Sequence, residues 1–162
     1  MNILTVNLAF STFVFWLAAR HYLLPRLPEL TPATVLMPIL LLHGMRHLGL
    51  MFLTEGATYP GIPDQFTYPA AFGDLLAAVL ALAAFLALAR DLQVSRLLVW
   101  VFTLEGSIDL AAAIVLATAY DAPRFMGPAY WIPAFWVPAL LVTHAVTFVV
   151  LLRHWPAQSR PA

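Results

Sequence analysis

Apolar residues gather in five long stretches, which short segments rich in proline and charge separate. The stretches cover residues 4–24, 33–53, 70–89, 97–119 and 129–152. A helix needs about 20 apolar residues to cross a hydrocarbon core about 30 Å thick, and each stretch reaches that length. The pattern predicts an all-α, polytopic membrane protein with five transmembrane helices. Because the loops and the tail are short, we expect a single domain over residues 1–162.

The longest predicted connection covers residues 54–69 and contains Pro60, Pro63 and Pro69. Prolines restrict the backbone, so we expect an ordered loop that folds over the outer mouth of the bundle. In the first helix Asn7 and Ser11 share one face, and the rest of the helix is expected to face lipid, at the periphery of the bundle. The other four helices then surround whatever polar site the protein contains.

Arginines are distributed unevenly between the two sides of the predicted bundle. One side holds six of them, and the other side holds only Arg124. The six are Arg20, Arg26, Arg90, Arg96, Arg153 and Arg160. Cytoplasmic loops carry the excess of basic residues, so we expect the N-terminus outside and the C-terminus in the cytoplasm. A composition rich in Ala, Leu and Arg favours a bacterial inner membrane.

The overall composition excludes several classes of protein. The chain is 62% hydrophobic and 10% charged, whereas soluble domains average about 45–50% and about 25%. A net charge of zero gives no basic surface for nucleic acid, so nucleic-acid binding is excluded. The absence of cysteine excludes disulfides and iron–sulfur clusters, and the absence of lysine excludes a Schiff base with retinal or pyridoxal.

Apart from Arg20 and His21, which are expected at the cytoplasmic interface, seven ionisable residues lie inside the apolar stretches. Each costs several kcal/mol unless it finds a partner in the bundle interior. They are His43, Arg46, His47, Asp74, Glu105, Asp109 and His144. In an α-helix, residues three or four apart share a face, so the three from the second helix are expected on one face and Glu105 with Asp109 on another. At 1.5 Å per residue, all seven fall within a slab about 10 Å thick. We therefore predict one polar cluster to which helices two, three, four and five all contribute.

Arg46 is the only arginine in this cluster, and we expect it to form a structural ion pair. A guanidinium stays charged in proteins, and its planar fork fits a carboxylate. Asp74 and Asp109 are its candidate partners, with Arg46–Asp74 as the preferred pair. The other carboxylates then need compensation by a metal, by bound protons or by charged histidines.

A metal site is the first hypothesis for the remaining groups. Imidazole and carboxylate together form a ligand set for Zn, Fe or Mn. The hypothesis assigns His43, Glu105 and His144 as metal ligands, and Asp109 or His47 as the catalytic group that shuttles protons. Such a site could make the protein an enzyme that acts on a lipid-soluble small molecule entering from the lipid bilayer.

Three alternatives use the same residues. Chains of His, Asp and Glu in membrane helices mark proton pathways, which would make the protein a proton-coupled transporter or a proton-conducting protein. His43 and His144 lie at similar predicted heights and could hold haem b between them. Finally, the polar groups could only fix helix packing in a homo-oligomer or in a structural subunit of a larger membrane complex.

Overall fold

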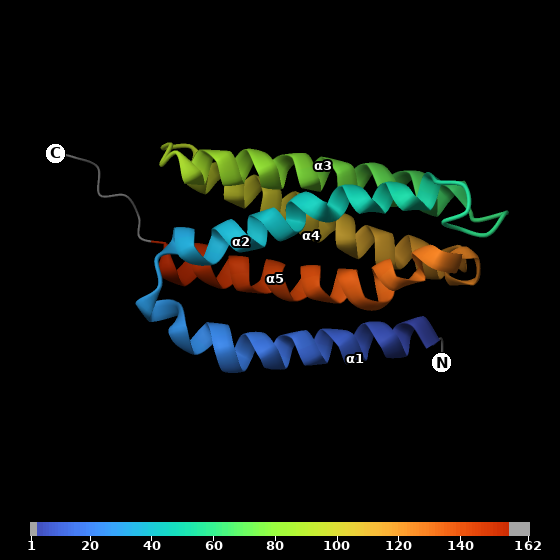
Figure 1. Cartoon of the computed structure of the whole chain (residues 1–162), viewed down its shortest axis with the longest axis horizontal. Coiled ribbons are helices and arrows are strands. Elements are labelled where there is room, and N and C mark those ends of the chain that lie inside the picture. Colours follow the sequence, from blue (N-terminus) through green and yellow to red (C-terminus); the bar gives the residue numbers. More distant parts are fainter. Residues whose placement is uncertain (1–2, 156–162) are drawn as a thin grey trace.

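The computed structural model describes residues 3–155, which are mostly helical and contain no strand. Figure 1 shows the long helices side by side, with the start of α1 and the end of the last helical segment at opposite ends of the bundle. Five helical segments are long and apolar enough to cross a membrane, which confirms the predicted all-helical fold and suggests a membrane protein. These segments are Ile3–Glu29, Pro32–Leu53, Asp64–Ala89, Ser95–Ala119 and Gly127–His154.

Several of these segments change their helical geometry along their length. The α-helices are α1 (Ile3–Ala18), α2 (Pro32–Gly44), α3 (Asp64–Ala89), α4 (Ser95–Ala119) and α5 (Val137–Val149). The 3₁₀ turns are η2 (Leu24–Glu29), η3 (Met45–Leu53), η4 (Ala122–Phe125) and η5 (Gly127–Tyr130). The π turns are η1 (Ala19–Leu23), η6 (Ile132–Trp136) and η7 (Val150–His154).

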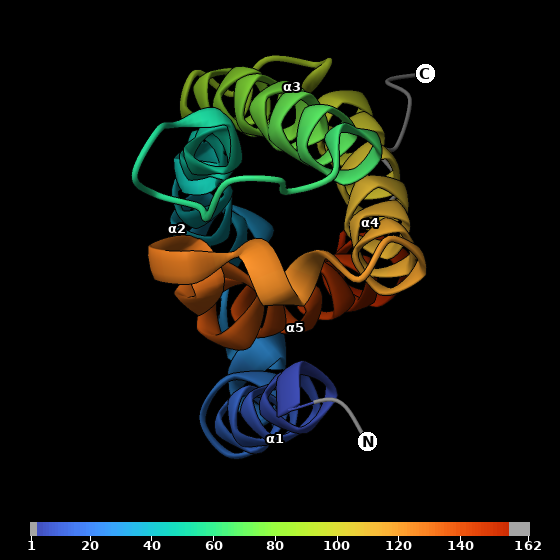
Figure 2. The ribbon, with the colours of Figure 1, turned by 90° about the vertical axis from the view of Figure 1, so that its right-hand side faces the viewer.

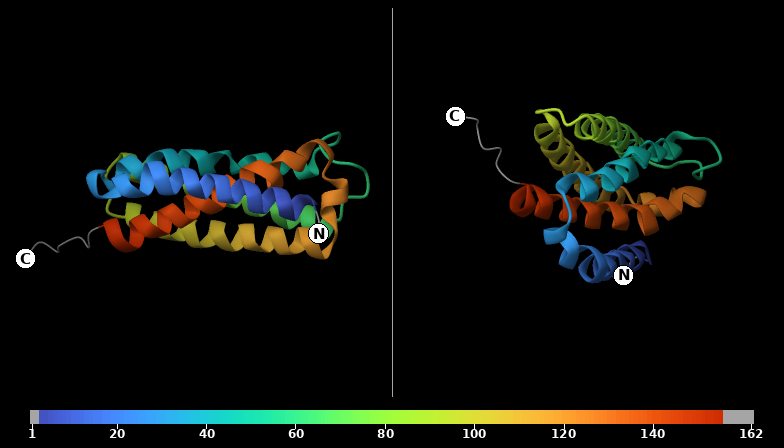
Figure 3. Two further views of the ribbon diagram at one scale, coloured as in Figure 1. Left: turned by 90° about the horizontal axis from the view of Figure 1, so that it is seen from below. Right: turned by 60° about the vertical axis from the view of Figure 1, so that its left-hand side comes forward.

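Helices α2, α3, α4 and α5 form a ring, and α1 lies outside it against α5 (Figure 2). Figure 3 shows the same peripheral position of α1 from two further directions. No residue of α1 is buried, and its packing partners are α5 and η6. The ring of four helices therefore provides the interior in which polar groups can be buried.

The third helix begins earlier than the sequence predicts. α3 starts at Asp64 rather than at residue 70, so the connection covers only residues 54–63. Asp64 is favourable in the first turn because its charge faces the positive end of the helix dipole. Pro69 lies inside α3, close to its start, where a missing N–H removes only one helical hydrogen bond.

Two apolar clusters fill the ring, one toward each end. The cluster toward the end that holds residue 155 includes Leu36, Leu40 and Phe102. The cluster toward the end that holds residue 3 includes Phe52 and Phe66. Arg46 of η3, Asp74 of α3, Asp109 of α4 and His144 of α5 lie between the two clusters along their segments.

Candidate functional site

The second membrane-length segment changes from α-helix to 3₁₀-helix at Met45. A 3₁₀-helix has three residues per turn, so every third residue points in the same direction. Accordingly Arg46, Gly49 and Phe52 are the buried residues of η3. A 3₁₀ run of nine residues is long, since runs beyond three or four residues are uncommon. The tighter winding directs Arg46 into the middle of the ring.

The same change of winding removes His47 from the predicted polar face. His43 is buried, but His47 is exposed, and its Nδ1 lies 3.1 Å from the carbonyl oxygen of Gly44. The prediction that His43 and His47 share one face is therefore wrong. It assumed 3.6 residues per turn, and four residues of a 3₁₀-helix overshoot a full turn by about a third.

Arg46 lies at the centre of the site and binds two carboxylates. Its Nε donates to Asp74 Oδ1 at 2.7 Å, and its Nη2 donates to Asp109 Oδ2 at 2.5 Å. Its Nη1 donates to the carbonyl oxygen of Gly106 at 3.2 Å and lies 3.5 Å from His144 Nε2. The side chains of Arg46, Asp74 and Asp109 are 0%, 11% and 13% exposed. Two ionised carboxylates would leave this cluster one negative charge in excess.

Three glycines let the neighbouring backbones approach these charged groups. A Cβ on Gly106 would lie 2.7 Å from Arg46 Nη1 and 2.8 Å from His144 Nε2. A Cβ on Gly49 would overlap the carboxylate of Asp74, and a Cβ on Gly73 would overlap that of Asp109. The glycines are therefore part of the site, although the sequence shows only that they lie near ionisable residues.

The two buried histidines form a second group beside the Arg46 cluster. The ring centroids of His43 and His144 are 4.3 Å apart, and Phe102 stacks on His144 at 5.0 Å. Thr143 Oγ1 donates to the carbonyl oxygen of Ala139, so His43 Nε2 donates to the same hydroxyl at 2.9 Å. Within residues 3–155, neither histidine has a hydrogen-bond partner for its buried Nδ1. Thr143 is not among the site residues predicted from the sequence, where its position next to His144 is the only indication of a role.

We predict that Thr143→Val destabilises the protein by about 1–3 kcal/mol, because it removes the hydroxyl from a buried histidine nitrogen. Thr143→Ser keeps that hydroxyl and is expected to stay within about 1 kcal/mol of the parent. Denaturant unfolding in detergent, followed by circular dichroism, measures both. Equal stability of the two variants would contradict the assigned hydrogen bond.

The predicted metal ligands do not come together as a set. Among the described residues, no three His, Asp or Glu side chains are arranged to hold a metal ion. Glu105 is half-buried, and its Oε2 is buried without a hydrogen-bond partner among residues 3–155. It borders a shallow hollow along α4 that Asp109 also lines. Haem b needs its two axial imidazoles on opposite faces of the porphyrin, and centroids 4.3 Å apart leave no room for the ring.

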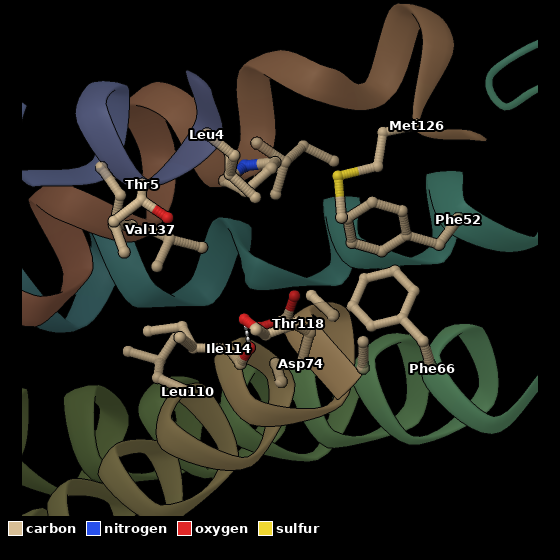
Figure 4. Close-up of a pocket in the computed structure, with 16 residues that line it drawn as sticks. Leu4, Thr5, Phe52, Phe66, Asp74, Leu110, Ile114, Thr118, Met126 and Val137 are labelled. Atoms are coloured by element: carbon tan, nitrogen blue, oxygen red, sulfur yellow. Dashed lines mark hydrogen bonds between the residues drawn. The ribbon is translucent and has the colours of Figure 1, made fainter. Parts of the chain in front are cut away.

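A cavity of about 210 Å³ lies next to the Arg46 cluster, toward the end of the bundle that holds residue 3. Figure 4 shows its apolar walls, to which Phe52, Phe66 and Leu110 contribute. Among the described residues that line it, Asp74 alone is ionisable. The exposed Thr5 of α1 and Thr118 of α4 also line it, so the cavity reaches the outer surface between these helices.

The fold and the site together define a candidate polytopic membrane protein with a charged cluster in its core and an apolar side cavity. The chain belongs to the family described as Domain of unknown function (DUF8737), whose model matches residues 3–152. Comparison with curated proteins gave no match, and comparison with solved structures gave none either.

Proposed function

We propose that this protein binds a lipid-soluble small molecule in the side cavity, with the polar group of that molecule at Asp74. The observation that carries the proposal is an apolar cavity of about 210 Å³ that ends on a buried carboxylate. Ligand sites in proteins combine mostly apolar walls with a few placed polar groups. The cavity has both features.

The size of the cavity limits what it can hold. An apolar cavity of about 150 Å³ inside a protein is known to bind benzene. A cavity of about 210 Å³ therefore has room for one ring with a short substituent, or for a chain of similar bulk. A longer tail would have to leave through the opening between α1 and α4.

The arrangement supports ligand binding more than proton conduction. A proton path along the bundle would have to cross both apolar clusters that flank the ionisable residues. Arg46 is also a poor relay, because a guanidinium does not release its proton in proteins. A ligand that enters from the side does not have to cross both apolar clusters, and its binding needs no proton transfer by Arg46.

We also propose that the five helices cross a bacterial inner membrane with the N-terminus outside. The support is the arginine distribution. Arg20 lies in η1, Arg26 in η2, Arg90 directly after α3, Arg96 at the start of α4 and Arg153 in η7, and these segments lie toward the same end of the bundle (Figure 1). Arg160, the sixth arginine of that count, lies outside the described residues. In this orientation the cavity lies in the outer half of the membrane and opens sideways into lipid.

Labelling of single cysteines tests this orientation, because the chain has no cysteine of its own. Glu55→Cys and Gln93→Cys place a thiol at exposed positions before and after α3, in connections that lie at opposite ends of this helix (Figure 1). On intact spheroplasts, a membrane-impermeant maleimide should label Glu55→Cys and should reach Gln93→Cys only after lysis. The reverse pattern would show that the orientation is inverted.

Analysis of bound molecules tests the proposed binding. Organic extracts of the purified protein are compared by mass spectrometry with those of Ala113→Trp, which fills the cavity that Ala113 lines. Ala111→Trp is the matched control, because Ala111 is an exposed residue of the same helix outside the cavity lining. We expect a molecule that the parent and Ala111→Trp retain and that Ala113→Trp loses. Identical extracts from all three proteins would contradict the proposal.

A further inference from the structure

The inner end of the cavity offers a ligand only hydrogen-bond acceptors. Asp74 Oδ1 is occupied by Arg46 Nε, whereas Asp74 Oδ2 has no hydrogen-bond donor among residues 3–155. The side chain of Asp74 is 11% exposed and lines the cavity. Arg46 is fully covered by its own partners, so its donors do not reach a ligand. An ionised carboxylate accepts hydrogen bonds and cannot donate them, so the ligand must supply the donor.

The charge balance of the cluster favours a positive ligand. Asp74 and Asp109 share the single guanidinium of Arg46, so one negative charge stays uncompensated when both carboxylates are ionised. An unpaired charge inside an apolar interior is costly. A ligand ammonium at Asp74 Oδ2 would supply both the missing donor and the missing charge, and charge-assisted hydrogen bonds of this kind are about twice as strong as neutral ones.

We propose that the ligand of this cavity is a small apolar amine, bound as an ammonium ion that donates to Asp74 Oδ2. This inference rests on the proposed function and specifies the chemical class of the bound molecule. The apolar body lies against the walls near Phe52 and Phe66, and the ammonium faces the carboxylate at the inner end. A proton on one aspartate is the competing way to balance the charge, and it would leave no preference for a cation.

Three probes of nearly equal shape separate these possibilities: 2-phenylethylamine, 2-phenylethanol and propylbenzene. Their binding is measured by calorimetry at pH 7 on the full chain in lipid nanodiscs, with empty nanodiscs as the blank. We expect the amine to bind at least tenfold more tightly than the alcohol, and the alcohol to bind no more than a few-fold more tightly than the hydrocarbon. An alcohol or hydrocarbon that binds as tightly as the amine would overturn the inference while the proposed function stands.

Two carboxylate variants locate the preference. Asp74→Asn should remove the advantage of the amine and leave propylbenzene binding unchanged. Glu105→Gln removes a carboxylate from the outer side of α4, away from the cavity lining, and should keep the advantage. An amine preference that survives Asp74→Asn would contradict the assignment to this residue.

The cavity-filling variant distinguishes a failure of the amine preference from a failure of the proposed binding in the cavity. Ala113→Trp should weaken all three probes by a similar factor, because it removes the space that they share. If Asp74→Asn does not fold, the probe ratio in the parent chain and its loss of binding in Ala113→Trp still decide the question. If no probe binds the parent chain, both the inference and the proposed function fail.

Discussion

Replacing Arg46 by Met is expected to lower the free energy of unfolding by about 3–5 kcal/mol, the usual cost of breaking a buried ion pair from one side. The substitution keeps most of the length of the side chain but leaves the carboxylates of Asp74 and Asp109 buried without their cation. The carbonyl oxygen of Gly106 loses its donor as well. Thermal and denaturant unfolding in detergent, followed by circular dichroism, measures the loss.

Two comparisons show whether the lost charge is the cause. Arg124→Met removes an arginine that is 76% exposed and pairs with Asp121 at the surface, and should change stability by no more than about 0.5 kcal/mol. Adding Asp74→Asn and Asp109→Asn to Arg46→Met should restore part of the stability, because the two charges that Arg46 compensates are then removed together with it. If Arg46→Met is as stable as Arg124→Met, the central role of Arg46 is wrong.

Gly73→Ala is expected to lower the free energy of unfolding by about 1–3 kcal/mol, although it adds only one methyl group. The new Cβ would overlap the carboxylate of Asp109, so either α3 and α4 must separate or Asp109 must leave Arg46. Both changes disturb a closely packed part of the bundle, because α3 and α4 pack along their length. The same unfolding measurements give the cost.

A double-mutant cycle isolates the contact between Gly73 and Asp109. In a background of Asp109→Ala, the carboxylate that obstructs the new methyl group is absent. Gly73→Ala should then cost at least 1 kcal/mol less than it does in the parent chain. Additive effects of the two substitutions would show that the cost has another origin, such as backbone flexibility.

The fold was largely predictable because long apolar runs are a strong signal in a sequence. Each of the five stretches is longer and more apolar than a helix of a soluble domain needs to be, and the structure has a membrane-length helical segment in each of these places. The start of α3 was missed because Pro63 and Pro69 both signal a break, and only Pro63 precedes the helix. The sequence does not show which proline the helix can accommodate.

The site was predictable only in part. The cost of burying ionisable groups identifies Arg46, Asp74 and Asp109 as candidates, but it does not show that one guanidinium holds both aspartates. The position of His47 depends on the change to 3₁₀ winding after Gly44, and no residue pattern in that segment predicts this change. The cavity depends on side chains from all five membrane-length segments, so it exists only in the folded protein.

Photolabelling of the cavity tests the central claim most directly. The protein in lipid nanodiscs is irradiated with a small aromatic hydrocarbon that carries a diazirine, and the modified residues are identified by peptide mass spectrometry. Binding in the cavity predicts adducts on Leu110, Ile114 and Met126 that Ala113→Trp suppresses. Exposed residues of α4, such as Ile108 and Val115, should be labelled equally in the parent chain and in Ala113→Trp. Labelling confined to the exposed residues, or cavity adducts that Ala113→Trp leaves unchanged, would contradict the account.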